Sequence, residues 1–407
     1  MSRLPQSLPT LPSDPADPPP PQPPVPPVEV AVGVEIDERD WSLSTKDGWF
    51  QMASAPPRTR PPHHSLDEIA GMSRGQRARY NHARALWHAN LGPIRTPGID
   101  MVFEALDEIV GANRQDGGKV KPAAVLDALP GLGKTTAATA FGRAFHTAQL
   151  QLHGQLVPAS DGQWQRVPVV YLGLTANTTI RSLSAMLCRF YGLPGADRGN
   201  ALRLSYRAAE CVANTKTRLI IVDDVHFLDV NRRDGREVAN HFKWLANTFP
   251  VTFFFVGVGL RARGLLDEGL TGADAAFSQT ARRWNVLSLH PFEVATEHGR
   301  RTWHRLLLAI DREIVLANHH RGVLAQELSD YLFVRSTGHF ASLMSLVARG
   351  CYRAVKTGTE QLSVALLDQV RIDQAAEQAR RALHAAVDAG RLRTRHSTAE
   401  LAAAGAP

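Results

Sequence analysis

The most informative segment of this 407-residue chain is Ala128-Leu-Pro-Gly-Leu-Gly-Lys-Thr135. It follows a short apolar run and precedes a long stretch of helical composition, which is the setting in which a P-loop occurs. Its two glycines allow backbone N–H groups to curl around phosphate oxygens, and the N-terminus of the following helix adds partial positive charge. The sequence therefore predicts a nucleotide site, and the residues expected to bind the nucleotide are Pro130, Gly131, Leu132, Gly133, Lys134, Thr135 and Thr136.

Two side chains of this loop have distinct chemical roles. Lys134 carries a compact charge that reaches the β- and γ-phosphates, and the hydroxyl of Thr135 is a ligand for Mg²⁺. The chain contains 39 arginines and only 7 lysines, so a lysine at this position stands out. Ala128 occupies the place where a P-loop usually has its first glycine, and it fits the loop if its φ angle is negative.

A second motif, Arg218-Leu-Ile-Ile-Val-Asp-Asp-Val-His226, joins four apolar residues to a pair of acids. This is the pattern of a Walker B strand, in which Asp223 emerges at the carboxyl edge of the sheet and holds Mg²⁺. Asp224 is the catalytic candidate that polarises the attacking water; glutamate is usual there, and the shorter side chain predicts slow hydrolysis. The alternative is a strand that ends in solvated acids, and we expect His226 to be a packed neighbour rather than a base.

Short apolar runs alternate with helical stretches through the middle of the chain. This pattern is typical of a parallel sheet that is covered on both faces. Strands are expected at 123–126, 167–172, 219–222, 251–256 and 286–289, with helices between them at 135–147, 182–191, 201–212 and 238–249. After about residue 291 only helices are expected, at roughly 295–311, 321–332, 340–356 and 361–388. The predicted fold class is α/β: a P-loop domain with a five-stranded parallel sheet, followed by a helical domain.

Composition divides the chain into five parts. Residues 1–34 hold 12 of the 26 prolines, and such a segment cannot build helices or sheets. We expect it to be a disordered spacer, with a docking peptide for a partner as the alternative. The other parts are an N-terminal extension with short helices (35–95), the α/β nucleotide-binding domain (96–292), a helical lid domain (293–388) and a flexible C-terminal tail (389–407).

The overall composition excludes several classes of protein. A formal net charge of +7 excludes an acidic disordered activator and is compatible with a nucleic acid or another polyanion as partner. Three widely spaced cysteines cannot form a disulfide framework or a CxxC metal pair. No apolar run approaches the roughly 18 to 20 residues of a membrane helix, and prolines interrupt the N-terminus where a signal peptide needs an apolar stretch. These features predict a cytoplasmic protein with no membrane partner.

In their order, the motifs resemble those of AAA+ ATPases, and more narrowly those of the transposition ATPases of the TniB, TnsC and IstB type. The resemblance covers roughly residues 66 to 370. Besides the P-loop and the Walker B strand, it is carried by Tyr80, Arg84, Trp87 and Thr96-Pro97, by Val169-Val170-Tyr171, by Tyr191-Gly192-Leu193-Pro194, by Phe242-Lys243-Trp244-Leu245-Ala246-Asn247, and by Ser336-Thr337-Gly338-His339-Phe340. It implies ATP and Mg²⁺ as cofactors, double-stranded DNA and a transposase or integrase as partners, and a homo-oligomer that forms a ring or filament.

The chain departs from the family pattern at two points. Val258 follows the fourth expected strand, where a polar sensor of the γ-phosphate is usual, and Ala341 stands where the lid usually has an arginine. Arg282 and Arg283 lie just before the fifth expected strand, in the region where these ATPases place an arginine finger that acts on a neighbouring subunit. We expect a catalytic role for these two arginines, with a solvated basic pair as the alternative.

Further basic residues are candidates for contact with DNA. Phosphate binding needs only exposed positive charge, so a solvated surface position is the alternative for each of them. The candidates are Arg181, Arg232, Arg233, Arg236 and Lys243.

The residues and the resemblance together predict an ATP-dependent regulator of DNA transposition. In this hypothesis ATP closes the cleft between the two domains and creates a surface for the next subunit on target DNA, and the assembly recruits or activates a partner transposase. The chain has no recognisable set of three separated carboxylates of the kind that a DDE nuclease uses. Two alternatives remain open: a STAND-like signalling or defence ATPase, and a scaffold that binds ATP without hydrolysing it, which Asp224 and Val258 favour.

Overall fold

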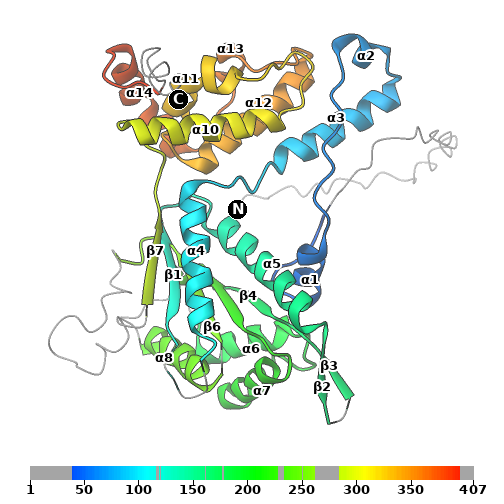
Figure 1. Cartoon of the computed structure of the whole chain (residues 1–407), viewed down its shortest axis with the longest axis vertical. Coiled ribbons are helices and arrows are strands. Elements are labelled where there is room, and N and C mark those ends of the chain that lie inside the picture. Colours follow the sequence, from blue (N-terminus) through cyan, green and yellow to red (C-terminus); the bar gives the residue numbers. More distant parts are fainter. Residues whose placement is uncertain are drawn as a thin grey trace, which may run out of the picture.

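The chain is described from a computed structural model, over residues 39–115, 119, 121–160, 162–176, 178–227, 233–249, 251–261 and 284–394. The tail predicted at 1–34 lies outside these residues, as does 395–407 of the predicted C-terminal tail. Figure 1 shows two lobes, which we call the α/β lobe and the helical lobe. Each has its own hydrophobic core: the first gathers residues between Trp49 and Leu289, and the second gathers residues between Val294 and Val370.

The α/β lobe is built on a five-stranded parallel sheet, as the sequence predicts. The strand order is β4-β5-β6-β1-β7, so the strand that leads into the P-loop has a neighbour on each side. The bounds are β1 Ala123–Ala128, β4 Val169–Gly173, β5 Leu219–Asp223, β6 Thr252–Gly257 and β7 Trp284–Leu289. Because the strands are parallel, their carboxyl ends meet at one edge, where the P-loop and Asp223 lie together.

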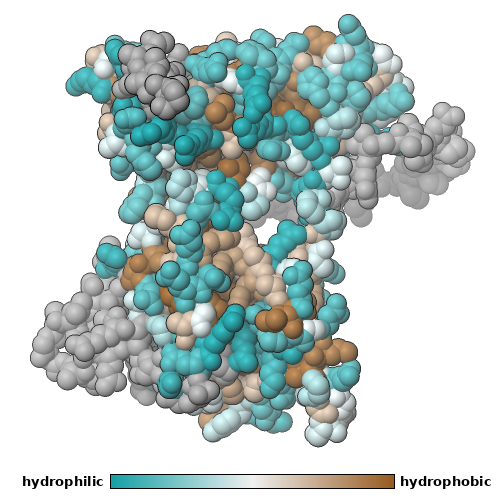
Figure 2. Space-filling model, in the orientation of Figure 1, coloured by the Kyte–Doolittle hydropathy of each residue, from teal (hydrophilic) through white to brown (hydrophobic). Residues whose placement is uncertain are grey.

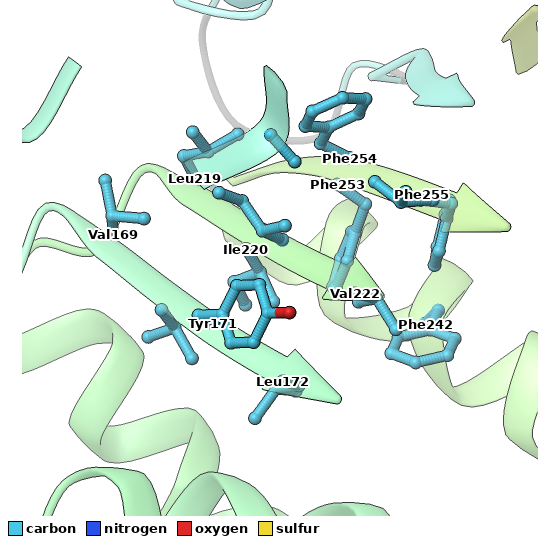
Figure 3. Packing of buried hydrophobic residues seen from close by; sticks show 14 of the residues in the cluster. Val169, Tyr171, Leu172, Leu219, Ile220, Val222, Phe242, Phe253, Phe254 and Phe255 are labelled. Carbon is cyan, nitrogen blue, oxygen red and sulfur yellow. The ribbon is translucent and has the colours of Figure 1, made fainter. Parts of the chain in front are cut away.

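The inner strands read as continuous apolar runs because both of their faces are covered. Every residue of β5 and of β6 is buried. Figure 3 shows Phe253 and Phe255 of β6 beside Phe242, which lies on α8 (Arg233–Thr248), the helix that precedes β6 in the sequence. The ring centroid of Phe242 lies 5.2 Å from each of the other two, in edge-to-face geometry. These aromatic rings form the part of the core beneath the Walker B strand.

Helices lie on both faces of the sheet. α5 (Lys134–His153) leads from β1 to β4, at one edge of the sheet. The helices between β4 and β6 lead back across the sheet in the opposite direction. Right-handed crossovers therefore put α5 on one face and the other helices on the opposite face. α1 (Lys46–Ser54) and α4 (Pro97–Ala112) contact α5 and complete its layer (Figure 1). The helices of the opposite face are α6 (Ile180–Phe190), α7 (Ala201–Asn214), the short turn η1 (Val225–Phe227) and α8 (Arg233–Thr248).

An antiparallel hairpin that the sequence did not predict extends from the end of α5 (Figure 1). It consists of β2 (Leu156–Ala159) and β3 (Gly162–Gln165). All four residues of β3 are exposed and β2 buries only Val157, so the hairpin lacks the run of alternating apolar residues that would predict it.

The helical lobe follows β7. Its elements are α10 (Glu297–Glu313), the π-helical turn η2 (Val323–Glu327), α11 (Ser329–Ser336), α12 (Phe340–Thr357), α13 (Val364–Leu367) and α14 (Gln374–Asp388). The helix expected at 321–332 is divided between η2 and α11, because the buried carboxylate of Asp311 accepts the N–H groups of Gly322 and Leu324 and ties that turn to α10. The helix expected at 361–388 is divided into α13 and α14, since Asp373 caps the second by accepting the N–H of Ala376 at 3.0 Å.

The N-terminal extension is shared between the two lobes. α1 inserts the fully buried Trp49 into the core of the α/β lobe. The chain then crosses to the helical lobe, where Arg60 donates to the carbonyl of Ile314 at 3.2 Å. α2 (Leu66–Gly71) and α3 (Arg74–Ala89) follow, and α3 packs against α12. At 16 residues, α3 is longer than the short helices expected for the extension.

Expectations drawn from composition can be compared with the fold. Cys188, Cys211 and Cys351 are buried and form no disulfide, which agrees with a role as core residues. Across the described ranges, no helix combines the length and the apolar character needed to cross a membrane.

Candidate nucleotide site

The P-loop joins β1 to α5 by a turn that requires glycine at two positions. Gly131 has φ +75° and Gly133 has φ +85°, backbone values that residues other than glycine rarely adopt. Ala128 ends β1, and it is not among the residues with positive φ, so its methyl group is compatible with the loop. α5 then begins at Lys134, and its N-terminus faces the inside of the loop.

The amine of Lys134 lies across this loop. Its Nζ donates to the carbonyl of Leu129 at 2.8 Å, and the side chain is mostly buried. Burial lowers the pKa of Lys134, although the nearby carboxylates of Asp223, Asp127 and Asp224 oppose this effect. A cation thus faces three carboxylates across a glycine-rich turn, which is the charge distribution that a phosphate with a divalent cation would complete.

Asp223 connects the Walker B strand to the P-loop. Its Oδ2 accepts the hydroxyl of Thr135 at 2.7 Å and the hydroxyl of Tyr171 at 2.9 Å, while its Oδ1 accepts the N–H of Asp224 at 2.8 Å. The carboxylate and the Thr135 hydroxyl are the hard oxygen ligands that Mg²⁺ prefers, and one or two such protein ligands suffice when phosphates and waters supply the others. The donor set therefore fits Mg²⁺, with Thr135 and Asp223 as the residues that would hold it.

Asp224 differs from its neighbour in both conformation and exposure. Its backbone has φ +59°, which is uncommon for a residue other than glycine, and its side chain is 53 % exposed. Partial burial and the charge of Asp223 raise the pKa of Asp224, so this carboxyl binds a proton more readily than an ordinary aspartate. Nδ1 of His226 lies 3.9 Å from Oδ1 of Asp224, and the His226 ring packs against Phe227. The carboxylate is thus available at the rim of the site.

A cavity of about 370 Å³ adjoins the P-loop. It lies where the start of α4, the end of β7 and the first helix of the helical lobe meet. Its walls are mainly apolar and include Ile99, Leu132, Leu289, Phe292 and Phe340. These residues come from four separate parts of the chain, so no local motif predicts the cavity. Its size and apolar walls suit an aromatic ring attached to a phosphate chain.

The helical lobe reaches the P-loop through the start of α12. The N–H of Ala341 donates to the carbonyl of Gly131 at 2.9 Å, and Phe340 lies near Gly133. Ala341 is the residue that departs from the family pattern, and its backbone rather than a long side chain makes the contact. Closely spaced backbones explain the small residues here: a Cβ placed on Gly131 would lie 3.4 Å from the Cβ of Ala341.

A carboxylate missed from the sequence braces the turn after β6. Asp127 of β1 accepts the N–H groups of Leu260 and Arg261, at 2.9 and 3.0 Å. Val258 lies in this turn, and its side chain offers no polar group. The parallel pairing of β1 with β6 brings Asp127 to this turn, and no local feature of the sequence predicts that contact.

The remaining predicted residues are described only in part. Arg232, Arg282 and Arg283 lie outside the described residues, as do the side chains of Arg233, Arg236 and Lys243 on α8. Arg181, at the start of α6, is described: it donates to the carbonyl oxygens of Asp197 and Gly199 in the loop before α7, at 2.9 and 3.1 Å. The predictions for these residues stay predictions.

Arg181 belongs to a group of arginines around the loop at 194–200, which we call the α6–α7 arginine cluster. Arg207 donates to the carbonyl of Pro194 at 2.8 Å, and Arg189 pairs with Asp197. Asp197 is the only acid in the sequence between 180 and 207. The members of the cluster are Arg181, Arg189, Arg198, Arg203 and Arg207, and all except the half-buried Arg207 are exposed.

The parallel sheet, the glycine loop with Lys134 and the adjoining helical lobe define a P-loop domain of the AAA+ class. A family model described as AAA domain matches residues 119–266. No curated protein matches the chain.

The comparison with solved structures finds ORC and Cdc6 proteins. The Aeropyrum pernix ORC1 protein in complex with DNA has a TM-score of 0.50 and 14 % identity, over 70 % of this chain and 67 % of that chain. The Aeropyrum pernix ORC2 protein has a TM-score of 0.49 and 15 % identity, over 69 % and 70 %. Cdc6p from Pyrobaculum aerophilum has a TM-score of 0.43 and 15 % identity, over 67 % and 66 %. At 14 % identity, the likeness to the ORC1 protein shows the fold alone, and the narrower resemblance to transposition ATPases stays a prediction.

Proposed function

We propose that this chain binds ATP with Mg²⁺ at the P-loop and hydrolyses it slowly. The observation that carries the proposal is the contact of 2.7 Å between the Thr135 hydroxyl and Asp223, beside the buried amine of Lys134. In this arrangement Lys134 contacts the β- and γ-phosphates, Thr135 and Asp223 hold the metal ion, and the apolar cavity takes the base. Asp224 orients the attacking water, and its short side chain is the reason for a slow rate.

The experiment that tests this proposal is a comparison of ATP affinity between the natural chain and Lys134→Ala. Hydrogen bonds to charged groups contribute about 1.5–3 kcal/mol, so affinity should fall roughly tenfold to hundredfold. Lys356→Ala, at the far end of α12, is the matched control and should bind as the natural chain does. Equal affinity for Lys134→Ala and its control would refute the site.

We further propose that the ATPase is a cytoplasmic regulator of DNA transposition that forms a ring or filament on double-stranded DNA and recruits a transposase or integrase. The ordered motifs of the transposition ATPases support this role, with Arg282 and Arg283 as the residues that reach a neighbouring subunit. The two separate cores support a division into a nucleotide-binding domain at 96–292 and a lid at 293–388.

The α6–α7 arginine cluster supports DNA as a partner. Five arginines surround one loop that holds a single acid, so the local charge is strongly positive. Binding to DNA phosphates releases counterions, and affinity should therefore fall steeply as salt rises. Electron microscopy with DNA and a non-hydrolysable ATP analogue tests the assembly: rings or filaments on DNA support the proposal, and monomers under the same conditions contradict it.

A scaffold that binds ATP without hydrolysing it is the second candidate. It is favoured by the short carboxylate of Asp224 and by the apolar Val258 in the turn that Asp127 braces. Phosphate release in the presence of Mg-ATP and DNA separates the two: measurable turnover that depends on Asp224 excludes the scaffold, and its absence favours it.

A further inference from the structure

Asp223 is held by more donors than the P-loop alone supplies. The Thr135 hydroxyl and the Asp224 N–H come from the two motifs themselves, but the third donor is Tyr171 of the edge strand β4. The phenol of Tyr171 donates to Oδ2 of Asp223 at 2.9 Å. Figure 3 shows its ring among the apolar core residues of β4 and β5.

The ring of Tyr171 is in turn held by the N-terminal helix α1. Trp49 is fully buried and stacks on Tyr171, with ring centroids 6.2 Å apart and planes at 13°. Its indole Nε1 donates to Nδ1 of His146 on α5 at 3.2 Å. Burial lowers the pKa of His146 to about 4, so the imidazole is neutral and its Nδ1 is available as an acceptor. One side chain of α1 thus contacts both the tyrosine and the helix that follows the P-loop.

The sequence is adapted to this close approach. A Cβ at Gly142 of α5 would lie 2.8 Å from the Trp49 ring, so only glycine leaves room for the indole at this point. Arg143, the next residue, donates to the carbonyl oxygens of Ala53 and Ala55 at the end of α1. α1 contributes the Trp49 ring to this contact. α5 supplies the space for the ring, the acceptor for the indole N–H and the donors that fix α1.

We propose that Tyr171 is a positioning residue for the magnesium ligand Asp223, and that Trp49 of α1 holds Tyr171 in place. This inference rests on the proposed function, because it assumes that Thr135 and Asp223 hold Mg²⁺ with a nucleotide. A carboxylate bonded at both oxygens cannot rotate freely, and hydrogen bonds are stronger in a buried setting than in water. Loss of such an outer partner typically lowers metal affinity by about tenfold to hundredfold.

The test uses Tyr171→Phe in the full chain. Phenylalanine keeps the ring that stacks on Trp49 and removes only the hydroxyl. Binding of a fluorescent ADP analogue is measured first in EDTA and then as a function of Mg²⁺ concentration. We expect the affinity for the ADP analogue in EDTA to be unchanged. The Mg²⁺ concentration that gives half of the maximal increase in analogue binding should rise at least tenfold. An unchanged or lower Mg²⁺ requirement overturns the inference.

Tyr191→Phe is the matched control. Tyr191 is also buried, and its hydroxyl makes a 2.7 Å hydrogen bond with Thr217 at the opposite end of the sheet. The control removes the same atom from a similar environment, so its Mg²⁺ requirement should equal that of the natural chain; a rise equal to that of Tyr171→Phe overturns the inference by revealing a general loss of packing. If the natural chain binds no nucleotide in either buffer, the proposed function fails instead.

The role of α1 is tested by Trp49→Phe, which keeps an aromatic ring and removes the indole N–H. We expect its Mg²⁺ requirement to rise in the same direction as that of Tyr171→Phe, but by a smaller factor. Trp87→Phe is its control, because the Trp87 indole donates to Glu313 in the helical lobe, away from the site. Equal Mg²⁺ requirements for the two tryptophan variants would overturn the part assigned to α1.

Discussion

Replacing Arg84 by methionine should destabilise the protein by about 3 to 5 kcal/mol. Arg84 lies on α3 and is fully buried, and its guanidinium meets the buried carboxylate of Glu360 at 2.6 Å (Nη1–Oε2) and 2.9 Å (Nη2–Oε1). It also lies 4.3 Å from the ring centroid of Tyr80. Methionine fills a similar volume, so the main cost is that Glu360 remains as a buried charge without its partner.

A second substitution separates the charge from the packing. Glu360 also accepts the N–H of Ala317 at 3.1 Å, and glutamine at this position would keep an acceptor for that group. The double variant Arg84→Met, Glu360→Gln leaves no buried charge unpaired. We therefore expect it to be more stable than Arg84→Met alone. Its loss of stability should also be smaller than the sum of the losses of the two single variants.

Urea unfolding followed by circular dichroism gives the free energy of each variant, provided that the slopes with urea agree. Arg353→Met serves as the control, because Arg353 makes an exposed hydrogen bond with Gln369 and its loss should cost less than about 1 kcal/mol. A loss of stability for Arg84→Met as small as that of the control would refute the prediction that an unpaired Glu360 is costly. A double variant as unstable as the sum of the single variants would refute it as well.

Three further predictions concern catalysis, pH and DNA. Asp224→Asn should bind ATP normally and release phosphate at least about a hundredfold more slowly, and an unchanged rate would remove Asp224 from catalysis. Burial lowers the pKa of His88 from 6.5 to about 3, so the unfolded chain binds a proton there that the folded chain does not. The free energy of unfolding should therefore fall by about 1.4 kcal/mol per pH unit as the pH drops below 6.5 toward 3. Urea unfolding at several pH values should show that the free energy of His88→Gln depends less steeply on pH. Arg203→Gln should weaken DNA binding and reduce its salt dependence by about one counterion, whereas Arg305→Gln on α10 should not; equal effects would exclude the α6–α7 arginine cluster as the contact surface.

The parts of the fold that the sequence predicted are those in which the signal is local. β5 and β6 are buried along their whole length, so they appear in the sequence as uninterrupted apolar runs. The P-loop is equally local, because its glycines, Lys134 and Thr135 are consecutive. Their spacing alone determined where backbone amides, amine and hydroxyl would meet a phosphate.

The parts that the sequence did not predict depend on contacts between distant segments. Tyr171 lies 52 positions before Asp223, and Trp49 lies 97 positions before His146. Nothing near Trp49 in the sequence distinguishes a residue that supports the nucleotide site from an ordinary buried tryptophan. The apolar cavity was not predicted for the same reason, since Ile99, Leu132, Leu289 and Phe340 meet only after both lobes have folded.

The route of the N-terminal extension has a mechanical consequence. Along the described residues the chain passes between the lobes three times: after α1, between α3 and α4, and between β7 and α10 (Figure 1). Figure 2 shows the narrow waist between the lobes in the same view. Three chain connections restrict the relative motion of the two lobes more than a single connection would. A proteolytic cut between α1 and α2 should remove one connection, leave both lobes joined, and so widen the range of motion between the lobes without dividing the molecule.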